Sequence, residues 1–269
     1  MVLLADGMID LRLGRWQEVL ADVETCDSIV CDPPYSARTH EGHDDAVRVA
    51  TWRRGNGAAW EATWAASGGR RRKIDYGLWT AADVDEFCAA WAQRCRGWTV
   101  TFNSHDLLPA ISAGFERRGR YSFAPLPFFS PGSRVRLSGD GPSSWTTWIN
   151  VTRPTTREFQ RWGTLPGGYV YPPEDMLVVG GKPLSLMRAI VRDYTRPGDL
   201  VVDPFCGGGT TALACAIEGR RCITSEMDPA TFELARKRLE RGFTRDMLVP
   251  QRPERVRAKQ GDLLDGGET

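Results

Sequence analysis

The stretch VVDPFCGGGTTA, residues 201–212, decides the fold. Its apolar start has the pattern of a buried strand that ends on Asp203, and three glycines, Gly207 to Gly209, precede a helix-like segment. A glycine turn of this kind lets a ligand approach the backbone at the N-terminus of a helix. The stretch therefore predicts a strand–turn–helix unit of a parallel α/β sheet, with a ligand site at the turn.

Glu226 favours a ligand that contains a nucleoside. It ends the next strand-like run, RCITSEM at residues 221–227, and a carboxylate there can accept two hydrogen bonds from a ribose diol. The spacing Gly207-x-Gly209-x-x-Ala212 also fits a dinucleotide-binding turn, and a plain strand–helix turn is the remaining alternative. No Gly-Lys-Ser/Thr follows, so the sequence does not indicate a phosphate-binding P-loop.

Strand and helix patterns alternate along most of the chain. We expect strands within residues 8–14, 27–35, 98–103, 121–129, 145–154, 197–206 and 221–227, and helices within residues 15–24, 80–95, 104–119, 183–195, 211–219 and 228–242. This alternation predicts an α/β fold with a doubly wound, mostly parallel sheet and helices on both faces.

A second stretch, SIVCDPPYSA at residues 28–37, ends a strand in an unusual way. An apolar run stops at Asp32, Pro33, Pro34 and Tyr35. Two prolines end the hydrogen-bonded ladder and stiffen the chain that follows. They would hold Asp32 and Tyr35 on a rigid ledge at the carboxyl end of the strand, although an ordinary loop is the simpler alternative.

Length and composition set outer limits on the protein. The chain has 269 residues, 41% of them hydrophobic, which suits one α/β domain with insertions or two small domains. We expect one catalytic domain over residues 1–269, with insertions at about 36–75 and 130–175. The net charge of +1 neither favours nor excludes a nucleic-acid partner.

The cysteines and the hydropathy pattern bear on the compartment. Seven cysteines without a C-x-x-C pair suggest neither a disulfide framework nor a zinc ribbon. The N-terminus lacks the pattern of a signal peptide, and no stretch of 18 or more apolar residues predicts a membrane span. We therefore expect a cytoplasmic location.

The motifs DPPY and DPFCGGGTT, in that order, resemble those of DNA amino-methyltransferases that use S-adenosylmethionine and methylate adenine N6 or cytosine N4. The order of the motifs, with the catalytic motif first and the cofactor motif last, is similar to the family's β arrangement. The resemblance covers residues 9–35 and 175–240, including GGKPLSLMRAIVRDYTRPGD before the cofactor strand. It implies a circularly permuted, Rossmann-like methyltransferase fold with inserted DNA-recognition loops.

The resemblance also implies roles for individual residues. Asp32 and the carbonyl of Pro33 would hold the target amine, Tyr35 would stack on the extruded base, and Pro34 would stiffen the ledge. The cofactor would be held by Asp203, Pro204, Phe205, Cys206, Gly207, Gly209, Thr210, Lys182, Pro183 and Glu226, with Lys182 and Pro183 near its methionine part and Glu226 on its ribose. If the segments DSIVCDP (27–33) and DLVVDPF (199–205) are the two central strands, their carboxyl ends flank the switch point of the sheet.

One position departs from the family pattern. Where the family commonly has an acid that contacts the cofactor's adenine amine, the segment LRLGRWQEVL has Arg15. Asp10, Gln17 or Glu18 would substitute for it, or the contact would be to backbone.

Basic residues in the irregular segments are candidates for DNA contact. They are Arg38, His40, Arg70, Arg71, Arg72, Lys73, Arg134 and Arg136. Arg and Lys in such loops suit phosphate contacts, whereas the simpler alternative is a solvated charged loop. His40, His43, Asp44 and Asp45 lie close together, but no metal site is expected.

The resulting hypothesis is a DNA adenine-N6 methyltransferase, because Asp rather than Ser precedes the prolines. The alternatives are a cytosine-N4 enzyme, a catalytically inactive DNA-binding protein of the same fold, a methyltransferase acting on RNA or protein, and an NAD-dependent enzyme. Double-stranded DNA would be the main partner, with a homodimer and a cognate restriction endonuclease as further partners.

Overall fold

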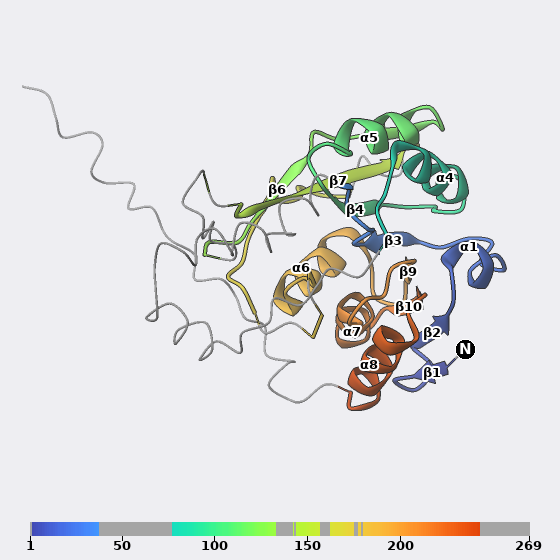
Figure 1. Ribbon diagram of the computed structural model, residues 1–269. Coiled ribbons are helices and arrows are strands. Elements are labelled where there is room, and N and C mark those ends of the chain that lie inside the picture. The colour runs from blue at the N-terminus through green and yellow to red at the C-terminus, as the bar shows by residue number, and fades with distance from the viewer. Residues whose placement is uncertain are drawn as a thin grey trace, which may run out of the picture.

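The strand patterns assemble into one mixed sheet with helices on both faces (Figure 1). The structure is a computed structural model that describes residues 2–37, 77–132, 142, 144–156, 162–174, 177–178 and 180–242. Its strands are β1 (Val2–Leu4), β2 (Ile9–Leu13), β3 (Ser28–Cys31), β4 (Thr99–Asn103), β5 (Arg120–Ser122), β6 (Leu126–Phe129), β7 (Thr146–Pro154), β8 (Tyr169–Val170), β9 (Leu200–Asp203) and β10 (Arg221–Glu226). Its helices are α1 (Trp16–Val19), α4 (Ala81–Trp91), α5 (Leu108–Glu116), α6 (Leu184–Tyr194), α7 (Thr210–Ile217) and α8 (Pro229–Glu240).

The centre of the sheet is parallel, as the alternating pattern predicted. The strand order is β1-β2-β10-β9-β3-β4-β7-β6-β8, with β5 paired to β7. Strands β2, β10, β9, β3 and β4 run parallel, and antiparallel pairs flank them. From β9 the chain continues to β10 on one side, and from β3 to β4 on the other. The order therefore reverses between β9 and β3, which confirms that the two motif-bearing strands are neighbours at the switch point.

The central strands are apolar on both faces because both faces are covered. In β9, Val201 belongs to the core under α6, α7 and α8, while Val202 belongs to the core under α1, α4 and α5. In β3, Val30 likewise belongs to the core under α6, α7 and α8, and Ile29 belongs to the core under α1, α4 and α5. This two-residue alternation explains why continuous hydrophobic runs form these strands.

Capping residues define two helices as the sequence indicated. Thr80 and Asp83 form a reciprocal capping box at the start of α4. Asp228 accepts the backbone N–H of Thr231 at 2.7 Å, and Pro229 takes the first position of α8. Both devices satisfy N–H groups that the first helical turn leaves unpaired.

Several predicted element bounds were wrong for local reasons. The helix expected at 15–24 is a single turn, because the guanidinium of Arg12 bonds the carbonyl of Val19 at 2.6 Å and the carboxylate of Asp22, and so ends it. The strand expected at 121–129 is divided into β5 and β6 around Pro125, which has no amide hydrogen. Strands β1 and β8 were not expected.

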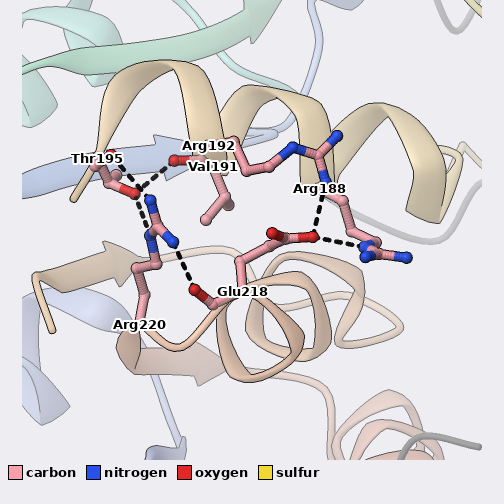
Figure 2. Close-up of polar contacts among 6 residues, drawn as sticks. All are labelled: Arg188, Val191, Arg192, Thr195, Glu218 and Arg220. Carbon is pink, nitrogen blue, oxygen red and sulfur yellow. Dashed lines mark hydrogen bonds and ion pairs between the residues drawn. The ribbon is translucent and has the colours of Figure 1, made fainter. Parts of the chain in front are cut away.

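A polar cluster holds α6 against the end of α7 (Figure 2). Glu218 accepts hydrogen bonds from Nε of Arg188 at 2.6 Å and from Nη1 of Arg192 at 2.7 Å. Both arginines of α6 therefore bind one carboxylate. Arg220 donates to the hydroxyl and carbonyl of Thr195, just beyond α6, at 2.8 and 2.9 Å. The cluster therefore fixes both the direction and the end of α6.

The two expected insertions lie partly outside the described residues. Most of the insertion expected at 36–75, and much of that at 130–175, is not among them. Within the described part of the chain, no helix is long and apolar enough to span a bilayer.

Arg120 is buried among uncharged hydrogen-bond acceptors that come from separate parts of the fold. Its guanidinium, in a residue only 4% exposed, donates to the carbonyls of Ala92 and Cys95 at 3.1 and 2.7 Å and to the hydroxyl of Thr152 at 2.9 Å. It thereby ties the end of α4 to β7.

We expect Arg120→Met to lower the free energy of unfolding by about 2–4 kcal/mol, because several buried acceptors lose their donor. Urea unfolding followed by circular dichroism measures the loss. Arg117→Met is the matched control, since Arg117 is exposed and its ion pair with Asp85 is screened by solvent. Equal losses in the two variants would contradict this account of Arg120.

Candidate active site

A cavity of about 610 Å³ opens where the carboxyl ends of β9 and β3 meet. The motif residues in its wall are Asp32, Pro33, Pro34, Tyr35, Lys182, Pro204, Phe205, Cys206, Gly207, Thr210 and Glu226. The two motifs, distant in the sequence, therefore face a single space. This is where open α/β sheets bind their ligands.

The glycine turn forms one wall of the cavity. Gly207 and Gly209 have φ of 51° and 76°, a backbone region that favours glycine. A side chain at Gly209 would also approach Leu239 of α8 to 3.3 Å, so the turn packs tightly against that helix. The chain can thus pass directly from the turn into α7 at Thr210, and the backbone of the turn faces the cavity.

Glu226 ties the end of β10 to the glycine turn. Its Oε2 accepts the N–H of Gly207 and its Oε1 the N–H of Asp228, both at 2.9 Å. Burial raises the pKa of this carboxyl above its usual value. A carboxylate has about four acceptor positions, so Glu226 can still accept hydrogen bonds from a diol in the cavity.

Asp203 lies beneath the turn and does not line the cavity. It is 1% exposed and accepts the N–H of Phe205 at 3.0 Å. Burial raises its pKa to about 7, and the nearby charges of Asp32 and Glu226 act in the same direction. Its carboxyl group therefore shapes the turn from within.

An acid, an ammonium group and two aromatic rings gather at the ledge that follows β3. Lys182 hydrogen-bonds Oδ2 of Asp32 and donates to the carbonyl of Gly180 at 3.1 Å. Its Nζ lies 5.3 Å from the ring centroid of Tyr35 and 4.9 Å from that of Phe102. Oδ1 of Asp32 is buried and has no hydrogen-bond partner among the described residues.

Other sequence-predicted residues take supporting positions. Gly209 caps α7, and Pro183 stands at the start of α6; neither is in the cavity wall formed by the described residues. Glu174 was missed by sequence reasoning. It accepts the N–H groups of Leu184 and Ser185 at 2.7 and 3.3 Å and so caps α6.

Several wall residues were also missed. Trp79 packs edge-on against Phe205, with ring centroids 5.2 Å apart, and Met227 and Leu234 line the cavity near Glu226. Trp79 follows the irregular insertion, where no periodic pattern could assign it to a site.

Arg15, the departure from the family pattern, lines the cavity. Of its three proposed substitutes, Gln17 is in the described wall, whereas Asp10 and Glu18 are not. Asp10 instead binds Arg12 at 2.8 Å. Gln17 donates to Glu86, another wall residue, at 3.2 Å.

The seven cysteines are all buried and free. Cys206 lines the cavity, but burial raises the pKa of its thiol, as it does for Cys31 at the end of β3. A thiol, not the reactive thiolate, is therefore present at neutral pH.

The residues expected to contact DNA are not among the described residues. Arg38, His40, Arg70, Arg71, Arg72, Lys73, Arg134 and Arg136 lie outside the described residues, as do His43, Asp44 and Asp45.

Comparison with solved structures places the chain in the Rossmann-like fold of DNA methyltransferases. The crystal structure of the M1.HpyAVI–SAM complex has a TM-score of 0.60 at 20% identity and covers 86% of this chain and 98% of that one. PvuII DNA methyltransferase (cytosine-N4-specific) has a TM-score of 0.58 at 15% identity and covers 90% and 92%. At these identities the likeness is one of fold.

Sequence comparison supports the same family for the C-terminal motifs. Residues 179–237 match the N6/N4 family model described as DNA methylase, in agreement with the resemblance drawn from the sequence. Type II methyltransferase M.XycI of Xanthomonas campestris pv. cyanopsidis is 41% identical over 58 residues, which are 22% of this chain and 19% of that protein. The matched segments span about a fifth of the length of such curated relatives.

The raised pKa of Asp203 predicts a pH dependence of stability. Between its unfolded pKa of 3.8 and its folded pKa of about 7, the folded protein holds a proton that the unfolded chain has released. Stability from this group is therefore present at low pH and lost as the pH rises through 7. Asp203→Asn should reduce the loss of unfolding free energy between pH 5 and 7 by on the order of 1–2 kcal/mol.

Urea unfolding at each pH measures this difference. Asp22→Asn is the control, because Arg12 lowers the pKa of exposed Asp22 and its titration falls below the tested range. An unchanged pH slope in Asp203→Asn would show that Asp203 is ionised throughout.

Proposed function

We propose that the protein transfers a methyl group from S-adenosylmethionine to the exocyclic amine of a base extruded from double-stranded DNA, most simply adenine N6. The observation that carries the proposal is the opening of the glycine turn and the Asp32–Tyr35 ledge onto one cavity. A nucleotide-binding turn alone would suit many enzymes, but the ledge adds an amine acceptor and an aromatic platform.

The cavity residues fit this cofactor. Two positive-φ glycines leave the backbone open at the start of α7, and Glu226 retains acceptor capacity beside them. Phe205, Met227 and Leu234 supply apolar walls. When bound, S-adenosylmethionine supplies an electrophilic methyl group.

Asp32 is the proposed acceptor of the target amine. An exocyclic amine is a weak nucleophile because its lone pair is delocalised into the ring. Hydrogen bonds to Oδ1 of Asp32 and to the carbonyl of Pro33 strengthen as positive charge develops on nitrogen. They therefore stabilise the transition state more than the ground state.

Tyr35 is the proposed platform for the extruded base. Extrusion from a duplex costs a few kcal/mol, and base–aromatic stacking returns about 1–3 kcal/mol. The prolines between Asp32 and Tyr35 hold the two groups in one arrangement.

Cytosine N4 is the alternative target. The first choice rests on Asp32, since a serine there would favour cytosine; the likeness in fold to a cytosine-N4-specific enzyme supports the alternative. Both belong to one reaction class, methylation of an exocyclic amine.

The proposal extends to domain organisation and partners. The whole chain would act as one catalytic domain, with residues 36–75 and 130–175 contacting DNA through the basic residues of those segments. The Type II methyltransferase names of the relatives suggest pairing with a restriction endonuclease. A homodimer and a cytoplasmic location complete the proposal.

Product identity tests the function directly. Plasmid DNA from cells that express the protein is digested to nucleosides and analysed by mass spectrometry, and single-molecule sequencing locates the modified position. N6-methyladenine supports the first choice, and N4-methylcytosine alone supports the alternative. Neither product, with DNA binding retained, would favour the inactive DNA-binding protein.

Asp32→Ala should lower the methylation rate at least about 100-fold, as expected for one lost electrostatic contact in the transition state. Tyr35→Phe keeps the stacking ring and should retain substantial activity, whereas Tyr35→Ala should lose base extrusion. Single-turnover kinetics measure the rates, and 2-aminopurine fluorescence at the target position reports extrusion. Near-parent activity in Asp32→Ala would overturn its role.

Glu226→Gln should weaken binding of S-adenosylmethionine about 10- to 100-fold, because a charged acceptor for the ribose is lost. Calorimetric titration measures the affinity. Glu233→Gln, an exposed change on α8 outside the described cavity wall, should bind as the parent does. Thermal stabilisation by NAD but not by S-adenosylmethionine would reject the cofactor assignment.

A further inference from the structure

Lys182 is held in the cavity from two sides. It is 8% exposed, although lysine is rarely buried without a partner. Its ammonium group binds Oδ2 of Asp32 and the carbonyl of Gly180. The next residue, Pro183, is the N-cap of α6, which Glu218 holds through Arg188 and Arg192 (Figure 2).

The described contacts add a second role to the one implied by family resemblance. The resemblance put Lys182 near the methionine part of the cofactor. The described contacts put its ammonium group on Asp32 and close to the rings of Tyr35 and Phe102. Lys182 therefore lies beside the acid that is proposed to hold the target amine.

Asp32 and Lys182 offer a hydrogen-bond acceptor beside a donor. Oδ2 of Asp32 is bound by Lys182, while Oδ1 is buried without a hydrogen-bond partner among the described residues. An ammonium group carries three N–H donors, so Lys182 sets a donor beside the Asp32 acceptor. The pair complements a ligand edge with an N–H donor next to an acceptor nitrogen.

Adenine and cytosine both present such an edge. In adenine the exocyclic amine lies next to ring N1, and in cytosine next to ring N3. Guanine and thymine have the reverse pattern, a carbonyl oxygen beside a ring N–H. They would place the oxygen against the carboxylate and the N–H against the ammonium, which is unfavourable at both positions.

We propose that Asp32 and Lys182 together recognise the amine–ring-nitrogen edge of the extruded base, with Oδ1 of Asp32 accepting an amine hydrogen and Nζ of Lys182 donating to the ring nitrogen. This inference rests on the proposed function and adds a base-recognition residue to it. Enzymes that read an extruded base do so through hydrogen bonds to this edge and stacking on its face. Tyr35 supplies the stacking surface beside the same ammonium group.

The ring-nitrogen contact forms with the bound base and does not depend on charge developing at the amine. It therefore stabilises ground and transition states alike, and its loss raises KM more than it lowers kcat. Asp32, in contrast, acts on the amine itself and affects kcat.

Deaza bases test the contact on the unmodified protein. The substrate is a duplex containing the site that product analysis identifies, with 1-deazaadenine at the target position, or 3-deazacytosine if the target is cytosine. Each replaces the ring nitrogen by C–H. The parent protein should methylate it with kcat/KM about 10- to 100-fold below that of the natural base.

Lys182→Met then isolates the part of that effect due to lysine. Any change in the intrinsic reactivity of the amine affects parent and variant equally, so the ratio of natural to deaza kcat/KM is compared. We expect the ratio in Lys182→Met to be at least about 10-fold smaller than in the parent protein, because only the part of the effect due to lysine is removed. Lys237→Met, an exposed lysine on α8 outside the described cavity wall, should keep the parent ratio.

The outcomes separate this inference from the proposed function. No methylation of any natural DNA would reject the function. Methylation with equal rates on natural and deaza bases by the parent protein would overturn the inference, even if Lys182→Met fails to fold. It is likewise overturned if Lys182→Met keeps the parent ratio and instead loses affinity for S-adenosylmethionine in calorimetry, since Lys182 would then serve the cofactor.

Discussion

The parallel pairing of β9 with β3 is the constraint on which the site depends. Ser28 lies opposite Val201 and Ile29 opposite Val202, so the two strands end side by side. Because both strands are buried on both faces, a shift of one residue would move every side chain to the other core. The register thus fixes the glycine turn and the Asp-Pro-Pro-Tyr ledge at one cavity, and it brings Lys182 to Asp32 across 150 positions of sequence.

Three acids meet at this edge, and the fold compensates each in a different way. Asp203 is buried with a raised pKa, Glu226 accepts two backbone N–H groups, and Asp32 binds Lys182. Unpaired buried carboxylates would repel one another and destabilise the fold. The arrangement also suits a ligand that carries positive charge, such as a sulfonium group.

The sequence predicted the parallel centre, the capped helices and the motif residues of the cavity wall because these features depend on local patterns. Val201 and Val202 indicate a buried strand, and Asp228 followed by Pro229 indicates a helix start. It did not predict that Arg12 would end the helix after Trp16, or that Trp79 would pack against Phe205. Those contacts join segments distant in sequence, for which no periodic pattern exists. The contact of Lys182 with Asp32 is another of this kind. The motif marked Lys182 as important, but only the packed structure places its ammonium group on Asp32.

The proposed reading of the base by Lys182 and Asp32 would also explain why one sequence motif resembles enzymes for two different bases. Adenine and cytosine share the amine–ring-nitrogen edge, so a carboxylate beside an ammonium group accepts both and rejects guanine and thymine. The bases differ in ring size, and discrimination between them must come from the surfaces beyond that edge. Tyr35 would be one such surface, because it lines the cavity and its ring centroid lies 5.3 Å from the ammonium group that would bind the edge. On this proposal, the ledge and Lys182 would recognise the amine, and the walls that receive the rest of the ring would select the base.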